Sequence, residues 1–259
     1  MLRDFLANKN LKFIDLTLPL KNGLQYRTAP VIKYEDHKEG AAAFRQRLNL
    51  PEDGFFNLGY ANDVITLSSH SGTHLDAPWH YAPTSEGKPA KTIDQIPLEW
   101  CCGAGVVLNF THKRKGELIT PDELSQALQK INYSLKPGNI VLIRTDCCQH
   151  YEKPEYQYMH PGMSREGTLW LIERGIKAMG TDAWGWDAAM DVLAEEYKKG
   201  NKEKFWASHY LGREREYCHL EKMCNFDRLP DYGFIVSVFP LKIQGGSGSP
   251  VRAVALVES

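Results

Sequence analysis

The sequence predicts a single α/β domain with a mixed β-sheet or barrel-like core and flanking helices. Segments rich in β-branched residues recur along the whole chain, and a smaller number of segments carry the apolar spacing of a helix. No internal repeat, low-complexity tract or long linker separates them. A chain of 259 residues with 42% hydrophobic content can bury one large core. We therefore predict one domain over residues 1–259.

The predicted strands lie between glycine, proline or polar turn residues. Short β-branched runs favour strands because branched side chains pack well on a pleated surface. The predicted strands are residues 12–16, 64–67, 105–108, 140–143, 234–238 and 252–257.

Three segments carry helical patterns. Thr120 resembles an N-cap, Pro121 occupies the first helical position, and apolar residues follow at helical spacing. Ser164 can cap a second helix, which we expect over residues 164–176. A third, amphipathic pattern runs through residues 187–200 and ends at a glycine. These helices are expected to flank the sheet.

Charge and composition disfavour several classes of partner. The chain has 31 basic and 32 acidic residues, so no long-range field attracts nucleic acid or an anionic membrane. No stretch approaches the ~18 apolar residues of a membrane span, and residues 1–11 lack a signal-peptide core. The six cysteines form no C-x-x-C spacing and are typical of buried free thiols in a reducing compartment. We therefore predict a cytoplasmic protein.

Three of the nine histidines, His70, His74 and His80, lie within eleven residues, together with Asp76. This segment directly follows the strand predicted at residues 64–67, a position where functional side chains often gather. From a loop or irregular turn, His70, His74 and Asp76 can supply two nitrogens and one oxygen at the ~2.0–2.2 Å that zinc-like metals require. The pattern therefore predicts a metal site.

The spacing of His70 and His74 differs from the helical H-E-x-x-H site of zinc proteases, because Gly72 lies between them and no glutamate follows the first histidine. Three protein ligands leave positions open for a water, whose pKa the metal lowers to ~7. His80 can then act as general base and acid, because an imidazole has an ordinary pKa of ~6.5. A further metal ligand or a hydrogen-bonded core histidine is the alternative interpretation of His80.

The run from His70 to His80 resembles the H-x-G-T-H-x-D-x-P-x-H signature of the cyclase-like metal hydrolases, a family that includes bacterial kynurenine formamidase and isatin hydrolase. The resemblance extends to residues 14–17, 93–98 and 248–253. It implies a swivelling β/β/α fold and assembly as a homodimer or homotetramer. Imidazole and carboxylate ligands without thiolate suit Zn²⁺ and Mn²⁺ equally.

The same resemblance implies two downstream ligands, a histidine and a glutamate twelve residues later. His209 and Glu221 have this spacing, and residues 225–230 resemble the run that follows the glutamate in the family. On this resemblance Asp76 bridges two metal ions, with His70 and His74 on one side and His209 and Glu221 towards the other. The segment 187–217 is longer and more charged than its counterpart in compact formamidases. If this segment covers the pocket, we expect a substrate that differs from that of the formamidases.

Several aromatic and acidic residues are candidates for supporting roles. Trp79, between a predicted ligand and the predicted base, is our candidate for binding an aromatic substrate, and Trp184 and Trp186 are further candidates. Asp182 and Asp187 flank these tryptophans. Either aspartate can orient a ligand histidine, although turn and capping roles fit the same positions.

The leading functional hypothesis is hydrolysis of a small non-peptide amide, similar to arylformamidase. Ring opening of isatin, a cyclic imide or a lactone needs the same ligands and differs only in the pocket walls. A cupin-like metal oxygenase or lyase also gives a strand-rich chain with a histidine and carboxylate site, but its H-x-H spacing is absent. A non-catalytic metal-binding protein is the remaining class.

Overall fold

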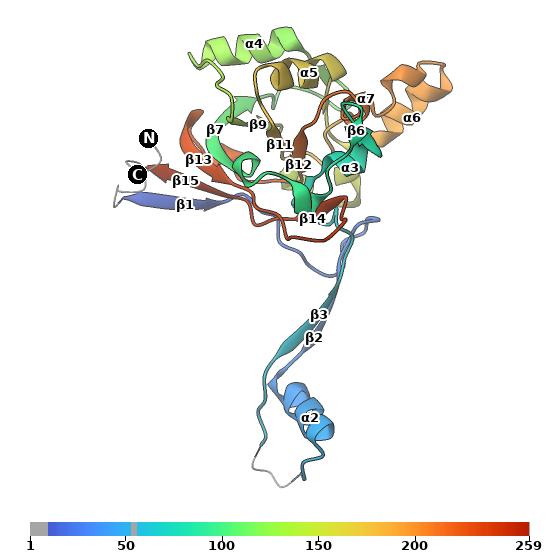
Figure 1. Ribbon diagram of the computed structural model, residues 1–259, viewed down its shortest axis with the longest axis vertical. Coiled ribbons are helices and arrows are strands. Elements are labelled where there is room, and N and C mark those ends of the chain that lie inside the picture. The colour runs from blue at the N-terminus through green and yellow to red at the C-terminus, as the bar shows by residue number, and fades with distance from the viewer. Residues whose placement is uncertain (1–9, 53–55, 259) are drawn as a thin grey trace.

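The computed structural model describes residues 10–52 and 56–258. Most of residues 1–11, the segment that lacks the pattern of a signal-peptide core, therefore lies outside the described residues. Nine strands form one mixed sheet (Figure 1). Its four middle strands pair in parallel and its outer strands pair antiparallel. The strands, in spatial order, are β1 (Leu11–Asp15), β15 (Val254–Glu258), β13 (Tyr232–Ser237), β7 (Cys102–Asn109), β9 (Ile140–Arg144), β11 (Ala178–Thr181), β12 (Cys218–Glu221), β4 (His74–Asp76) and β14 (Gly248–Pro250). The predicted single α/β domain with a mixed sheet is confirmed.

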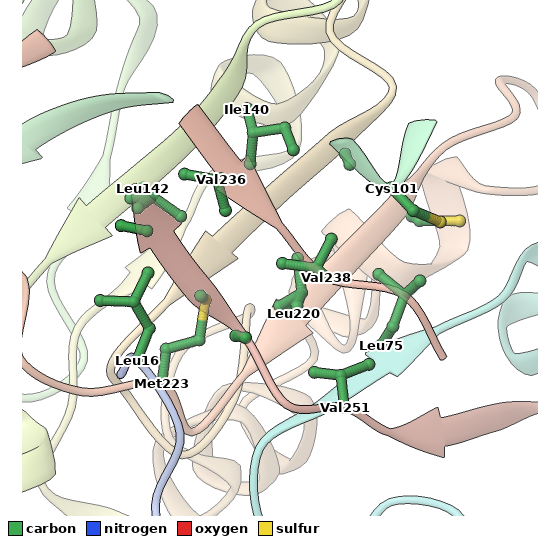
Figure 2. Close-up of a cluster of buried hydrophobic side chains, with 14 of the residues drawn as sticks. Leu16, Leu75, Cys101, Ile140, Leu142, Leu220, Met223, Val236, Val238 and Val251 are labelled. Carbon is green, nitrogen blue, oxygen red and sulfur yellow. The ribbon is translucent and has the colours of Figure 1, made fainter. Parts of the chain in front are cut away.

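The sheet curls on itself like half of a barrel. Ile14 on β1 and Leu75 on β4 come from opposite ends of the strand order, yet both belong to one buried cluster. Figure 2 shows part of this cluster, which includes Leu142 and Leu220 from the middle strands together with Leu75. Burial of these aliphatic side chains is the main stabilising contribution to the fold.

The opposite face of the sheet packs against helices. Alternate residues of β7 divide between the two cores, with Val107 in the inner cluster and Val106 and Leu108 in the outer one. This alternation follows from the two-residue period of a strand. Leu124 and Leu171 contribute helical side chains to the outer cluster. The helices are α3 (Pro78–Tyr81), α4 (Pro121–Lys130), α5 (Arg165–Glu173), α6 (Met190–Lys198) and α7 (Ala207–Leu211).

Two of the three predicted helix starts are confirmed, and the third was too early, since α6 begins at Met190 and not at residue 187. Thr120 caps α4 by accepting a hydrogen bond from the Glu123 backbone N–H, and Ser164 caps α5 by accepting from the Gly167 N–H at 2.9 Å. The predicted ends of the second and third helices were too late, since α5 stops at Glu173 and α6 at Lys198.

A separate arm projects away from the sheet (Figure 1). It consists of the antiparallel hairpin β2 (Val31–Glu35) and β3 (Asn62–Thr66), with α2 (His37–Leu48) near its tip. The strand predicted at residues 64–67 therefore belongs to the arm and not to the sheet. The remaining strands are the short pairs β5 (Thr84–Ser85) with β6 (Lys88–Pro89) and β8 (Leu118–Ile119) with β10 (Gly162–Met163). Among the described residues no helix is both long and apolar enough to cross a membrane.

Candidate metal centre

Strands β4 and β12 place four polar side chains on one face. Their antiparallel register sets His219 opposite Asp76 and Glu221 opposite His74. Residues two apart on a strand point to the same face, and directly opposed side chains begin about 5 Å apart. His219 Nε2 therefore lies 3.1 Å from Asp76 Oδ2 and 3.3 Å from Glu221 Oε1. His74 Nε2 lies 3.2 Å from Asp76 Oδ1 and 3.7 Å from Glu221 Oε2.

These positions correct the expectation that a loop leaving a strand holds the ligands. His74 and Asp76 lie within β4 itself, which is paired on both sides, by β12 and by β14. Only His70 comes from the connection between the arm and β4. A paired strand holds its side chains more rigidly than a loop, which suits a preorganised site.

His209 reaches the same cluster from α7. Its Nε2 lies 3.9 Å from Asp76 Oδ2 and 3.8 Å from Glu221 Oε1. Its Nδ1 donates to Asp187 Oδ2 at 2.5 Å, and the Trp206 ring stacks on the imidazole with centroids 4.5 Å apart. A carboxylate that accepts a hydrogen bond from one ring nitrogen of a histidine fixes the tautomer, and the other ring nitrogen is then available as the ligand atom. Asp187 therefore has the orienting role, rather than only a turn role.

His74 and His219 both direct Nε2 at the cluster. His74 Nδ1 lies 2.9 Å from the Gly72 carbonyl oxygen, which can only accept, so Nδ1 carries the hydrogen. Tyr81 Oη donates to the Asp76 carbonyl oxygen at 3.4 Å and accepts from His219 Nδ1 at 3.0 Å. Both Nε2 atoms are buried and have no hydrogen bond with acceptable geometry to any described residue.

This donor set fits a divalent cation. Two ligands at ~2.0–2.2 Å from one tetrahedral ion lie about 3.4 Å apart. One ligand atom from each of Asp76, His209, His219 and Glu221 lies within 4.8 Å of the other three. Burial lowers the pKa of His219, but Asp76 and Glu221 outweigh burial and raise that pKa to about 9, so without a metal a proton holds the position that a bound cation would take.

The two carboxylates are ionised. Burial alone would raise the pKa of Asp76, but the charges that His80, His74 and His70 carry in acid outweigh burial and hold that pKa well below its usual range. Burial would also raise the pKa of Glu221, but the contact with His219 and the charge of Lys222 outweigh burial and lower that pKa. The centre is therefore a buried anionic site.

His70 and His80 form a second group that shares Asp76. His70 Nδ1 lies 2.6 Å from Asp76 Oδ1, and His80 Nε2 lies 3.6 Å from Asp76 Oδ2. Gly248 permits this arrangement, since a Cβ there would lie 2.8 Å from His70 Cε1. Burial lowers the pKa of His80 to about 4, so its imidazole is neutral at pH 7 and available as a ligand or a base.

A cavity of about 490 Å³ opens onto these residues. Trp184, Trp186 and Trp206 line it, together with His80 and the metal-binding side chains. Trp79, our candidate for substrate binding, is 43% exposed and is not among the lining residues. Its side chain cannot face the cavity because α3 turns it outward while turning His80 inward.

The segment 187–217 forms one wall of the cavity through Asp187, Met190, Trp206 and His209. Asp182, the other acidic candidate, accepts hydrogen bonds from the backbone N–H groups of Thr145 and Asp146 and contacts no histidine through a hydrogen bond among the described residues. Of the two aspartates, therefore, only Asp187 orients a histidine of the cluster.

A comparison with models of known protein families assigns the chain to a family. The family model "Putative cyclase" matches residues 14–188. The chain belongs to the cyclase family. Cyclase-family relatives cover almost all of it: a kynurenine formamidase of Bacillus cereus is 27% identical over 248 residues, which is 95% of this chain and 98% of the relative. An isatin hydrolase of Roseibium aggregatum is 27% identical over 208 residues, 76% of this chain and 75% of the relative.

Solved cyclase-family structures share the whole fold. Isatin hydrolase A from Ralstonia solanacearum superposes with a TM-score of 0.77 at 27% identity, covering 99% of this chain and 96% of that one. Isatin hydrolase A from Labrenzia aggregata gives a TM-score of 0.76 at 26% identity, covering 100% and 98%. Family membership and the buried cluster together make this chain a metal-dependent hydrolase of the cyclase family.

The predicted site residues of this cyclase-family chain converge in space, with one exception. The structure brings together His70, His74, Asp76, His80, His209 and Glu221, and leaves Trp79 outside. Sequence analysis missed His219 and Lys222. The position of His219 two residues before Glu221 on one strand was the available signal, because such a pair shares a face.

Lys222 is the second missed residue. It is 3% exposed and its Nζ lies 3.5 Å from Glu221 Oε2 and 4.4 Å from the centre of the Trp184 ring. This ammonium group offsets part of the negative charge of the two carboxylates, while the indole face offers further stabilisation of the cation. Nothing in the local sequence distinguishes Lys222 from a surface lysine.

Proposed function

We propose that the protein hydrolyses small aryl amides, with formanilides such as N-formylkynurenine as the type substrate. The observation that carries this proposal is the register of β4 and β12, which directs two buried Nε2 atoms and two ionised carboxylates at one point beside a cavity. The kynurenine formamidase relatives, which span nearly the whole chain, support the choice of an amide.

We propose Zn²⁺ or Mn²⁺ as the cofactor, with one or two ions per subunit, since imidazole and carboxylate ligands suit both metals. A first ion would be held by Asp76, His209, His219 and Glu221, with His74 at its edge, and a second by His70 and the shared Asp76. A bound ion would polarise the carbonyl and lower the pKa of a water.

The protein's own groups would complete the reaction. Neutral His80 accepts a proton from the attacking water, and the imidazolium returns that proton to the nitrogen as the C–N bond breaks. The water oxygen ends on the carbonyl carbon, and the products are an aryl amine and a carboxylic acid, which releases the second proton of the water to solvent as it becomes a carboxylate. The indole rings of Trp184, Trp186 and Trp206 give flat apolar walls for the aryl group.

A second candidate is ring opening of isatin or a related cyclic amide, imide or lactone. The similarity to isatin hydrolases in both sequence and structure favours this candidate. The chemistry is the same, because a lactam also exposes a carbonyl carbon to water and releases an aryl nitrogen.

Turnover of a substrate panel tests the proposal. Formanilide, isatin, a cyclic imide and an aryl lactone are each incubated with the purified protein in the presence of Zn²⁺ or Mn²⁺. We expect hydrolysis of formanilide or isatin in preference to the other two. Absence of turnover on all four compounds, in a protein that retains its metal, would contradict hydrolysis of this substrate class.

The role of His80 has its own test. His80→Ala is expected to retain bound metal and to lose most hydrolysis, about 10²–10⁴-fold, as expected for a lost general base. His112→Ala, an exposed histidine away from the centre, is the control. Loss of metal in His80→Ala would instead make His80 a ligand, and unchanged turnover would remove its catalytic role.

We further propose that the protein forms a homodimer or homotetramer through the arm. Val31, Tyr34, Leu58 and Val64 on the arm are each more than half exposed. The accessible surface of 13906 Å² exceeds by about 2,400 Å² what a compact 29.4 kDa monomer exposes. A hairpin with both faces in water is only marginally stable alone, so a second copy that covers the arm would account for both observations.

Sedimentation tests this assembly. The wild type is expected to sediment as a dimer or tetramer at micromolar concentration, and Leu58→Asp is expected to shift it towards the monomer. Phe13→Asp, at an equally exposed apolar position on β1, is the control. A monomeric wild type would contradict the assembly.

We also propose a cytoplasmic location, since all six cysteines are free thiols, as a reducing compartment would keep them.

A further inference from the structure

His160 is a cavity residue that the proposed reaction does not use. It lies between the short 3₁₀ turn Pro154–Tyr158 and β10, and its side chain is 1% exposed. It lines the same cavity as Glu221 and His209. Within the described residues it belongs to neither group of side chains that could hold a metal ion.

One nitrogen of His160 has an unsatisfied lone pair. Nδ1 lies 2.8 Å from the Pro161 carbonyl oxygen, which can only accept, so Nδ1 carries the hydrogen. Nε2 is then an acceptor, provided that the ring is neutral, and burial lowers the pKa of His160. Nε2 is buried and has no hydrogen-bond partner among the described residues. A buried acceptor without a donor destabilises the folded state, so a ligand that brings a donor to this nitrogen would be favoured.

Gly185 lies between the His160 ring and the metal centre. A Cβ on Gly185 would lie 3.5 Å from His160 Cε1 and 3.7 Å from Glu221 Oε1. The absent side chain therefore leaves an opening with the imidazole on one side and the carboxylate on the other. The nitrogen of an amide is bonded directly to its carbonyl carbon. In a substrate whose carbonyl binds at the metal centre, the amide nitrogen would therefore lie beside the centre and face one of the cavity walls.

We propose that His160 Nε2 accepts a hydrogen bond from the N–H of the substrate's amide or lactam, and so selects secondary amides over N-alkylated ones. The inference rests on the proposed function, because it takes that substrate class as given. His160 transfers no proton in this role. It holds the nitrogen in place while the C–N bond breaks, and the aryl amine product keeps the same N–H.

Matched substrates with and without the N–H test the proposal. The ratio of kcat/KM for formanilide to that for N-methylformanilide, and for isatin to N-methylisatin, is measured for wild type, His160→Phe and His160→Gln. Phenylalanine keeps a ring but has no acceptor, whereas glutamine offers a carbonyl oxygen. His160→Phe is expected to lower the N–H to N-methyl ratio about tenfold by weakening only the N–H substrates, and His160→Gln to restore part of the ratio.

Metal content and melting temperature of each variant are measured beside the rates, and both are expected to match the wild type. An equal loss on N–H and N-methyl substrates would overturn the proposal and leave His160 with a structural role. A loss of bound metal in His160→Phe would overturn it by making His160 a support of the metal centre. A wild type that hydrolyses neither pair would instead refute the proposed function, and the inference with it.

Discussion

His209 Nδ1 donates to Asp187 Oδ2 at 2.5 Å, and this bond determines which nitrogen of His209 faces the two carboxylates. Asp187 also accepts from the backbone N–H groups of Ser208 and His209, so it anchors the first turn of α7 as well as the ring. The orientation of one ligand is therefore built into the start of a short helix.

Removal of Asp187 should weaken metal binding. Asp187→Ala frees the His209 ring to rotate and to adopt the other tautomer, and loss of such an orienting carboxylate typically costs 10–100-fold in metal affinity. Titration of the metal-free protein with Zn²⁺ measures the effect. Asp191→Ala, which removes an ion pair with Lys115 and a hydrogen bond from the Val192 backbone N–H, is the control because Asp191 contacts no histidine of the centre. Equal affinities in the two variants would contradict the orienting role.

Removal of the metal should lower stability as well as activity. Without a cation, Asp76 and Glu221 are two buried negative charges at one point, and a ligand that binds only the folded state stabilises it by an amount that grows with the logarithm of its affinity. Dialysis against a chelator is expected to lower the melting temperature, and added Zn²⁺ or Mn²⁺ to restore it. A melting temperature that the chelator leaves unchanged would contradict this prediction. It would show that Lys222 and the histidines offset the charge of the two carboxylates without a metal.

Leu142→Ala should destabilise the fold without touching the site. Leu142 is fully buried on the central strand β9, in the cluster of Figure 2, and truncation of such a side chain costs about 2–5 kcal/mol of unfolding free energy. Denaturant unfolding measures it. Leu98→Ala, at a position 66% exposed, is expected to change stability by about 0.5 kcal/mol or less. Similar values for the two variants would contradict the assignment of this core.

The buried thiols should be unreactive in the folded protein. Burial raises the pKa of Cys147 to about 11 and that of Cys224 to about 12, so only a trace of either is thiolate at pH 8. Iodoacetamide at pH 8, followed by mass spectrometry, is expected to label both residues only after denaturation. Rapid labelling in the native state would contradict their burial.

The fold class could be predicted because its signals are local. Five of the six predicted strands lie in the sheet, and the caps at Thr120 and Ser164 mark real helix starts. The strand at 64–67 was assigned to the wrong part of the molecule, because alternation of side chains predicts a strand but not its partner. Its partner is β2, in an arm that the sequence pattern does not distinguish from the body.

The motif from His70 to His80 could be found because its residues are close in sequence. His219 joins them only through the register of β4 and β12, a contact across more than a hundred residues that no local pattern encodes. Trp79 and Trp206 show the same limit. Trp79 is adjacent to the motif yet faces outward, whereas Trp206 is distant in sequence yet stacks on His209.

The most direct test of the central claim is the metal content and the hydrolytic activity of one preparation, measured together. Elemental analysis of the wild type is expected to find Zn²⁺ or Mn²⁺, with turnover of formanilide or isatin that falls in step with the metal as chelator is added. Asp76→Ala, which removes the carboxylate shared by both groups of ligands, is expected to lose metal and turnover together. A wild type whose turnover is unaffected after its metal is removed would contradict the account.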